Sequence, residues 1–146
     1  MLPILDKFHY STPIQIRWND LDPLGHVNNS LYCTYFEIVR GSYMLTASPS
    51  WSWDKDMFLI ASMEVAFYKE LTLRATHTTA YCRMSKLGTK SFEVEYAITS
   101  MDSKGQTILH ALGKSTQVLF NVKEKITMEI PSWLREELAL FENTTK

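Results

Sequence analysis

The feature that most constrains the fold is one long helical pattern, which lies between a short alternating run and several longer ones. Over residues 30–46, apolar side chains recur at spacings of three and four, which puts them on one helical face. That face comprises Tyr32, Tyr35, Phe36, Val39 and Tyr43. Leu31, Ile38 and Leu45 widen it, so we expect the helix to be mostly buried. Pro49 then marks the end of the helix.

The residues after this helix alternate with the period of β-strands. Four such runs follow the helix, at residues 57–68, 76–86, 92–99 and 107–121. A shorter run with the same alternation precedes it, at residues 13–18. Residues 87–90 and 101–105 read as hairpin connections. Hairpin-linked strands form an antiparallel sheet, and such a sheet needs cover on one face. We therefore predict an α+β fold in which an antiparallel sheet wraps around one long central helix.

Length, charge and cysteine content restrict the class of protein further. The 146 residues fit a single domain spanning 1–146, and a short last helix is expected from Pro131 with Ser132 as its N-cap. A net charge of -1 argues against a nucleic-acid partner. No apolar run approaches the ~18 residues of a membrane span, and the first residues do not resemble a signal peptide. Two cysteines suggest no disulfide framework. We expect a cytoplasmic protein without membrane insertion.

The most informative polar residues lie just before the helix. They are two carboxylates and an imidazole: Asp20, Asp22 and His26. Pro23 and Gly25 force a sharp loop between them, because proline fixes φ and glycine permits a positive φ. Asn28 or Asn29 can cap the helix that follows. A helix start offers unpaired N–H groups and partial positive charge, which suit a developing oxyanion. This combination indicates acyl transfer to water.

Turn and capping chemistry is the common role of two carboxylates spaced in this way. Three functional interpretations of the motif require features that the sequence lacks. A calcium loop would need oxygen ligands where Leu24 and Leu31 stand. A magnesium-dependent phosphoryl-transfer site would require a parallel sheet, whereas the hairpin-linked strands predict an antiparallel one. A zinc site would need His26 to meet His77 or His110, which follow no ligand spacing. We expect no metal and no cofactor.

The stretch from Arg17 to Arg40 resembles the hotdog-fold acyl-CoA thioesterases of the 4-hydroxybenzoyl-CoA thioesterase-like family. The pattern reads Arg-x-x-Asp-x-Asp-x-x-Gly-His-Val-Asn-Asn, followed by Tyr-x-x-Tyr-x-Glu-x-x-Arg at helical spacing. The Asp-Leu-Asp and His-Val-Asn-Asn segments are also similar to plant acyl-carrier-protein thioesterases. The turn at residues 87–91 resembles the family's turn into its next strand, so the likeness covers roughly residues 8–135.

The resemblance implies a fold, an assembly and roles for the loop residues. It implies an antiparallel sheet around a central helix, and a homodimer or dimer of dimers with active sites between subunits. Asp22 matches the catalytic carboxylate, which acts as base or nucleophile. The amide of Asn29 matches the donor that polarises the thioester carbonyl. His26 matches the imidazole of the plant enzymes, whereas Leu24 stands where those enzymes carry an asparagine.

Further residues are expected near the substrate. Gly25, Val27 and Asn28 belong to the loop that would contact it. Glu64 sits amid apolar residues on a predicted strand, and both a pocket-lining carboxylate and a solvated one fit that position. By resemblance, Ser91 approaches the active site of the partner subunit.

Three polar residues near the motif are expected to be structural. Asp20 is expected to fix the loop through backbone hydrogen bonds. Cys33 lies one turn inside the helix and fits a small packing residue better than a nucleophile. Glu37 is spaced for an ion pair with Arg40.

The predicted function is hydrolysis of an acyl-CoA to the free acid and coenzyme A. Two alternatives stay open: an acyl-carrier-protein thioesterase, and a non-catalytic acyl-thioester-binding protein on the same scaffold. A hydratase is disfavoured because the differently placed Asp and His of related hydratases are not found. The sequence does not define the acyl chain.

Overall fold

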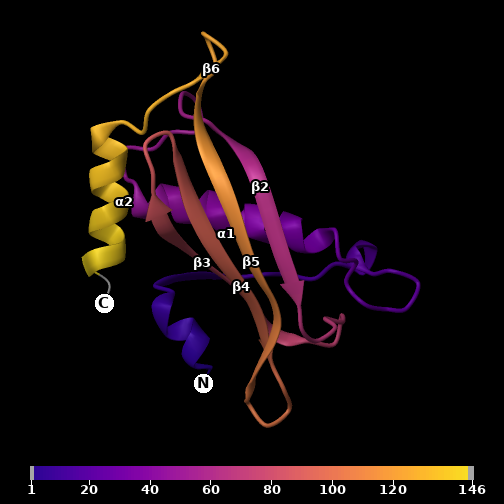
Figure 1. Cartoon of the computed structure of the whole chain (residues 1–146). Coiled ribbons are helices and arrows are strands. Elements are labelled where there is room, and N and C mark those ends of the chain that lie inside the picture. The colour runs from indigo at the N-terminus through magenta and orange to yellow at the C-terminus, as the bar shows by residue number, and fades with distance from the viewer. Residues whose placement is uncertain (1, 145–146) are drawn as a thin grey trace.

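The computed structural model describes residues 2–144, and residues 1, 145 and 146 of the expected domain lie outside the described part. A curled antiparallel sheet packs against one long helix (Figure 1). The strands are β1 (Tyr10–Pro13), β2 (Phe58–Phe67), β3 (Thr76–Leu87), β4 (Ser91–Met101), β5 (Thr107–Asn121) and β6 (Ile126–Thr127). The helices are α1 (Leu31–Ala47) and α2 (Ser132–Thr144), with short 3₁₀ turns η1 (Pro3–Lys7) and η2 (Trp18–Asp20). The predicted α+β class and the central helix are confirmed.

The sheet runs in the order β1-β3-β4-β5-β2, and β6 pairs with β5 beside this path. Every neighbouring pair is antiparallel. The strand that follows α1 in the chain, β2, therefore lies at one edge, and β1 lies at the other. This order places the end of β2 next to the start of α1, where the candidate site is found.

The inner face of α1 supplies the centre of the core. Phe36 is fully buried and stacks on Tyr96 of β4 with ring centroids 4.5 Å apart. A Cβ atom at Gly113 of β5 would overlap the Phe36 ring, so the missing side chain lets the helix approach the sheet. Each large apolar side chain buried in this way contributes about 1.5–3 kcal/mol to stability.

The outer face of α1 is more exposed than the sequence predicted. Ile38 is 50% exposed and Leu45 is 53% exposed. The expectation that both join the buried face is wrong, because at 3.6 residues per turn they lie about 180–200° around the helix from Phe36. The apolar character of Ile38 and Leu45 therefore did not indicate which way their side chains point.

The expected ion pair between Glu37 and Arg40 is also wrong. Arg40 is buried against the sheet, where its Nη1 donates to the Tyr96 hydroxyl at 3.0 Å and its guanidinium lies 5.6 Å from the centre of the Phe58 ring. Glu37 is exposed. The three-residue spacing is compatible with a pair, but tertiary packing draws Arg40 inward.

The first strand is shifted from the prediction. The sequence predicted a strand over 13–18, whereas β1 ends at Pro13 and pairs with β3 from Tyr10 opposite Cys82. The chain then turns, because the Arg17 N–H donates to the Asp20 carboxylate at 3.1 Å. A local side-chain bond of this kind competes with strand pairing.

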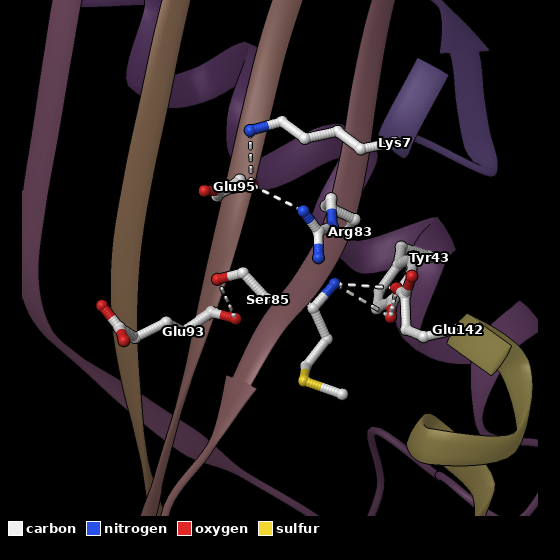
Figure 2. A network of polar contacts seen from close by, with 8 residues as sticks. Lys7, Tyr43, Arg83, Ser85, Glu93, Glu95 and Glu142 are labelled. Atoms are coloured by element: carbon white, nitrogen blue, oxygen red, sulfur yellow. Dashed lines mark hydrogen bonds and ion pairs between the residues drawn. The ribbon is translucent and has the colours of Figure 1, made fainter. Parts of the chain in front are cut away.

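Helix α2 is held against the rest of the molecule by glutamates. The Glu142 carboxylate accepts hydrogen bonds from the Tyr43 hydroxyl at 2.6 Å and from the Met84 N–H at 2.9 Å. Figure 2 shows Glu142 directed toward Tyr43. The part of β3 that pairs with β1 ends at Cys82. Glu142 therefore binds the backbone of β3 at Met84, just beyond the residues that β1 pairs with. Glu137 accepts hydrogen bonds from the serines that follow α1, Ser48 and Ser50.

Candidate active site

The loop between η2 and α1 is anchored by Asp20. This carboxylate is 1% exposed, and it accepts hydrogen bonds from the Arg17 backbone and guanidinium and, at 2.8 Å, from the Tyr35 hydroxyl. Its backbone carbonyl accepts the Asn28 N–H at 2.8 Å. Burial raises the pKa of Asp20, but the hydrogen bonds from Arg17 and Tyr35 outweigh it and hold the pKa below its ordinary value. Asp20 is therefore structural, as the sequence predicted.

Replacing Asp20 with alanine is expected to lower the free energy of unfolding by about 3 kcal/mol, because it leaves the buried Tyr35 hydroxyl without its partner and removes a hydrogen-bonded buried charge. Urea unfolding of the variant and of the parent protein measures this difference. A loss below about 1 kcal/mol would show that the loop does not depend on this anchor.

Asp22 lies at the start of a tight turn and keeps one oxygen free. Its Oδ1 accepts the N–H groups of Leu24 at 2.9 Å and His26 at 3.2 Å. The Gly25 N–H returns to the Asp22 carbonyl at 3.0 Å, and Gly25 has a φ of 78°, which glycine adopts without strain. Within residues 2–144, no donor reaches Oδ2 of Asp22. The turn thus holds the carboxylate in place while leaving an oxygen to accept a proton.

The next residues tie the loop to the segment that leaves β2. The Val27 N–H donates to the Leu71 carbonyl at 2.7 Å, and His26 forms a bridge with Thr72. Val27 is buried, and its side chain belongs to the core. These contacts bring the Asp22 turn against residues that are far away in sequence.

The start of α1 presents an unpaired backbone donor. Asn28 Oδ1 accepts the Ser30 N–H at 3.0 Å and the Ser30 hydroxyl at 2.9 Å. The helix N-cap is Ser30, whose side chain makes no capping bond. In the described part of the chain, the N–H of Asn29 has no acceptor. This N–H lies at the positive end of the α1 dipole, where it can receive a partial negative charge.

A cavity of about 210 Å³ joins these groups. It is lined by Asp22, His26, Val27, Asn29, Tyr32, Phe67, Tyr68, Lys69 and Glu70. Four of the predicted site residues thus line one cavity, and they include the residue with a free carboxylate oxygen, Asp22, and the residue with a free backbone N–H, Asn29. Gly25 and Asn28 do not line it and instead shape the turns on either side.

The sequence did not identify the contribution of the segment at 68–70. It carries no motif, and long-range contacts bring it here: the pairing of β2 with β5, the bonds from the loop to Leu71 and Thr72, and the contact of His110 with Lys69. Tyr32 was predicted as a core residue, and its place at the cavity was also missed. Finding either would have required the order of the strands in the sheet, which the period-two pattern does not define.

Two predicted residues lie away from this cavity. Glu64 is exposed on β2 opposite Lys114 and does not line this cavity, so its expected contact with the substrate stays a prediction. Ser91 begins β4 opposite Val118, whereas Phe67 pairs with Ala111, seven residues before Val118 on β5. At about 3.3 Å per residue, Ser91 is roughly 23 Å from the cavity of its own chain. Its expected approach to a partner's site stays a prediction.

His110 of β5 holds the 68–70 segment in place. The ring is buried, its Nδ1 lies 2.9 Å from the Lys69 carbonyl, and its Nε2 lies 2.7 Å from the Ser100 hydroxyl. The carbonyl accepts only, so Nδ1 carries the proton and Nε2 of a neutral ring accepts from Ser100. Burial lowers the pKa of His110 below its ordinary value.

This lowered pKa predicts a loss of stability in acid. The unfolded chain binds a proton at His110 with a pKa of about 6.5, whereas the folded chain resists it, so the unfolded state gains protons first as the pH falls. The contribution of the neutral His110 ring to the free energy of unfolding is complete above about pH 6.5 and declines below it. Replacing His110 with asparagine should reduce the drop in unfolding free energy between about pH 7.5 and about pH 5.5. The exposed His77, changed to asparagine in parallel, should leave that drop as in the parent, and equal drops in all three proteins would contradict the assignment.

Comparisons with known proteins define the family and the fold. Residues 16–138 match the model of the thioesterase-like superfamily. The match covers most of the chain, so the protein belongs to this superfamily. No protein of curated function matches the sequence. Among residues 2–144, no helix is long and apolar enough to cross a membrane.

Solved structures show the same fold. A thioesterase from Thermus thermophilus, complexed with coenzyme A and Zn, has a TM-score of 0.79 and 28% identity, covering 94% of this chain and 96% of that one. A protein from Pseudomonas aeruginosa strain PAO1 has a TM-score of 0.80 and 24% identity, covering 93% of each chain. The 4-hydroxybenzoyl-CoA thioesterase from Pseudomonas sp. strain CBS-3 has a TM-score of 0.78 and 16% identity, covering 88% and 97%. The last two show the fold alone, which is the hotdog fold. Family and fold together support a thioester hydrolase.

Proposed function

We propose that this protein hydrolyses an acyl-CoA to the free acid and coenzyme A. The observation that carries the proposal is that one small cavity is lined both by Asp22, which has a free Oδ2, and by Asn29, which has a free N–H. A base and an oxyanion donor on opposite sides of a reacting carbonyl are what hydrolysis of a thioester requires. The choice of coenzyme A as the carrier is supported by the Thermus thermophilus relative that binds it.

The reaction follows from the positions of these groups. Asp22 takes a proton from water as the water oxygen bonds to the thioester carbon, and the carbonyl electron pair moves to oxygen. The Asn29 N–H and the α1 dipole stabilise that oxyanion, and one such donor is worth about 3 kcal/mol. The oxyanion then collapses, the carbon–sulfur bond breaks, and the thiolate leaves and takes up a proton. Direct attack by the Asp22 carboxylate, followed by hydrolysis of the anhydride, uses the same geometry.

We assign His26 a supporting part. Its N–H and carbonyl complete the Asp22 turn, and its side chain lines the same cavity. No metal takes part in this proposal, and within residues 2–144 no three His, Cys, Asp or Glu residues form a metal-binding group.

We further propose that the active protein is a dimer joined along β2. This strand is an edge of the sheet and exposes apolar side chains, with Leu59 45% and Ile60 41% exposed. Exposed edge strands of this kind pair readily with another strand. In an antiparallel pair of β2 strands, the start of one lies beside the end of the other. Because Ser91 lies level with the start of β2, this pairing would carry Ser91 of one protomer toward the cavity of the other.

A non-catalytic binding protein on this scaffold is the rival function, and carrier-protein thioesters are the rival substrates. Incubation with aromatic and long aliphatic acyl-CoAs, followed by mass spectrometry of the small molecules, separates hydrolysis from binding. We expect the free acid to accumulate. Faster turnover of the same acyl group on acyl carrier protein would assign the carrier instead, and intact thioester bound to protein would reject the hydrolase.

A further inference from the structure

One buried tyrosine differs from the others in having no partner. Four tyrosines in residues 2–144 are at most 2% exposed: Tyr32, Tyr35, Tyr43 and Tyr96. Three of them are hydrogen-bonded, Tyr35 to Asp20 at 2.8 Å, Tyr43 to Glu142 at 2.6 Å and Tyr96 to Ser115 at 2.6 Å. The hydroxyl of Tyr32 makes no hydrogen bond to any described residue. The Tyr32 oxygen is not one of the fully buried unpaired atoms of the described residues, so it reaches the surface of the cavity that Tyr32 lines and is open to a molecule bound there.

The backbone places Tyr32 where such a partner would bind. It is the second residue of α1, and its N–H donates to the carbonyl of Asn29, three residues earlier, with N and O 3.4 Å apart. Helical side chains lean toward the N-terminus of their helix, so this ring extends toward the loop that carries Asp22. The ring is fixed edge-on against Phe67 with centroids 5.0 Å apart, and it lines the cavity shared by Asp22 and Asn29.

We propose that the Tyr32 hydroxyl donates a hydrogen bond to the thioester carbonyl oxygen, so that Tyr32 and the Asn29 N–H form an oxyanion site with two donors. The inference rests on the proposed hydrolysis and names a further catalytic residue for it. Water supplies the nucleophile and Asp22 takes its proton, as above. Tyr32 keeps its own proton throughout, and its hydrogen bond strengthens as the carbonyl oxygen gains negative charge.

The surroundings of Tyr32 favour this role. Burial and the nearby charge of Glu70 raise the pKa of Tyr32, so the hydroxyl stays protonated at neutral pH and acts as a donor. A donor that is already held in position and desolvated costs little reorganisation when the charge develops. Because the oxyanion is more basic than the thioester carbonyl, the donor acts mainly in the transition state.

The test is the substitution Tyr32→Phe, measured on the acyl-CoA that the parent protein hydrolyses fastest. We expect kcat to fall by about a hundredfold while KM changes little, since the missing donor acts mainly in the transition state. The melting temperature should not fall, because the hydroxyl has no partner in the folded chain. A kcat within about threefold of the parent value would overturn the proposal, and so would a loss of rate that comes with a clearly lower melting temperature.

Tyr35→Phe is the matched control, one turn further along α1. It also removes a single hydroxyl, but this one bonds to the buried Asp20, so its loss should lower the melting temperature. Tyr32→Phe should therefore lower kcat without lowering the melting temperature, whereas Tyr35→Phe should lower the melting temperature. If Tyr32→Phe behaves like Tyr35→Phe, the role of Tyr32 is structural.

A spectroscopic measurement separates this proposal from the proposed function. In an Asp22→Asn background, a bound aromatic acyl-CoA should show a lowered carbonyl stretching frequency, and adding Tyr32→Phe should move it back toward the value in water. No return on adding Tyr32→Phe would overturn the Tyr32 role while leaving hydrolysis by Asp22 intact. A parent protein that hydrolyses no thioester would overturn the proposed function and this inference with it.

Discussion

Replacing Asp22 with asparagine is expected to reduce kcat by at least about a hundredfold, because an amide cannot accept the proton that a general base removes from water. The fold should not change. The asparagine carbonyl oxygen can still accept the N–H groups of Leu24 and His26 that Oδ1 of Asp22 accepts now. Steady-state kinetics and thermal unfolding of the same preparation measure the two effects.

The contrast with Asp20 makes this prediction specific. The two carboxylates are two residues apart, but Asp20 is buried and hydrogen-bonded, whereas Asp22 keeps one oxygen free and lines a cavity. Changing Asp20 should therefore reduce stability, whereas changing Asp22 should reduce rate. An Asp22→Asn variant that turns over as fast as the parent would remove this residue from the mechanism.

Placing lysines at Leu59 and Ile60 together is expected to separate the protein into monomers and to abolish most of its activity. Both side chains are exposed on the edge strand β2, so the charges should cost the folded monomer little. In an edge-to-edge dimer, however, each pair of lysines would lie against the end of the partner's β2, where their charges would be desolvated without a partner of opposite charge. Sedimentation or light scattering measures the mass, and the thioester assay measures the activity.

Ile38→Lys provides the matched control for this variant. Ile38 is exposed to a similar degree but lies on the outer face of α1, away from β2. It should keep the mass and the activity of the parent dimer. If the double lysine variant keeps the parent mass, β2 is not the interface. A monomer with full activity would show that the site is complete within one chain.

The sequence predicted the elements and the proximity of the loop residues well where the signal is local. The 3.6-residue period defined α1, and alternation with turn residues defined the hairpins of the sheet. The carboxylate, the glycine turn and the helix start are adjacent in the chain, so their proximity in space follows from short-range geometry. Asp22, His26 and Asn29 accordingly line one cavity.

The errors arose where direction or long-range pairing decides the outcome. Apolar character at Ile38 and Leu45 did not tell that these side chains point outward. The spacing of Glu37 and Arg40 allowed an ion pair, but the sheet offered Arg40 the ring of Phe58 and the Tyr96 hydroxyl instead. The 68–70 segment reaches the cavity through long-range contacts, strand pairing and the His110 hydrogen bond among them, and these leave no motif in the sequence.

Whether this protein is an acyl-CoA hydrolase is decided most simply by the release of free thiol from a panel of acyl-CoAs incubated with the purified parent protein. The panel should include short aromatic and long aliphatic acyl groups, because the identity of the acyl chain is the open variable. We expect catalytic release of coenzyme A from at least one member, over many turnovers. Tight binding of these thioesters with no thiol released from any of them would contradict the proposed hydrolysis.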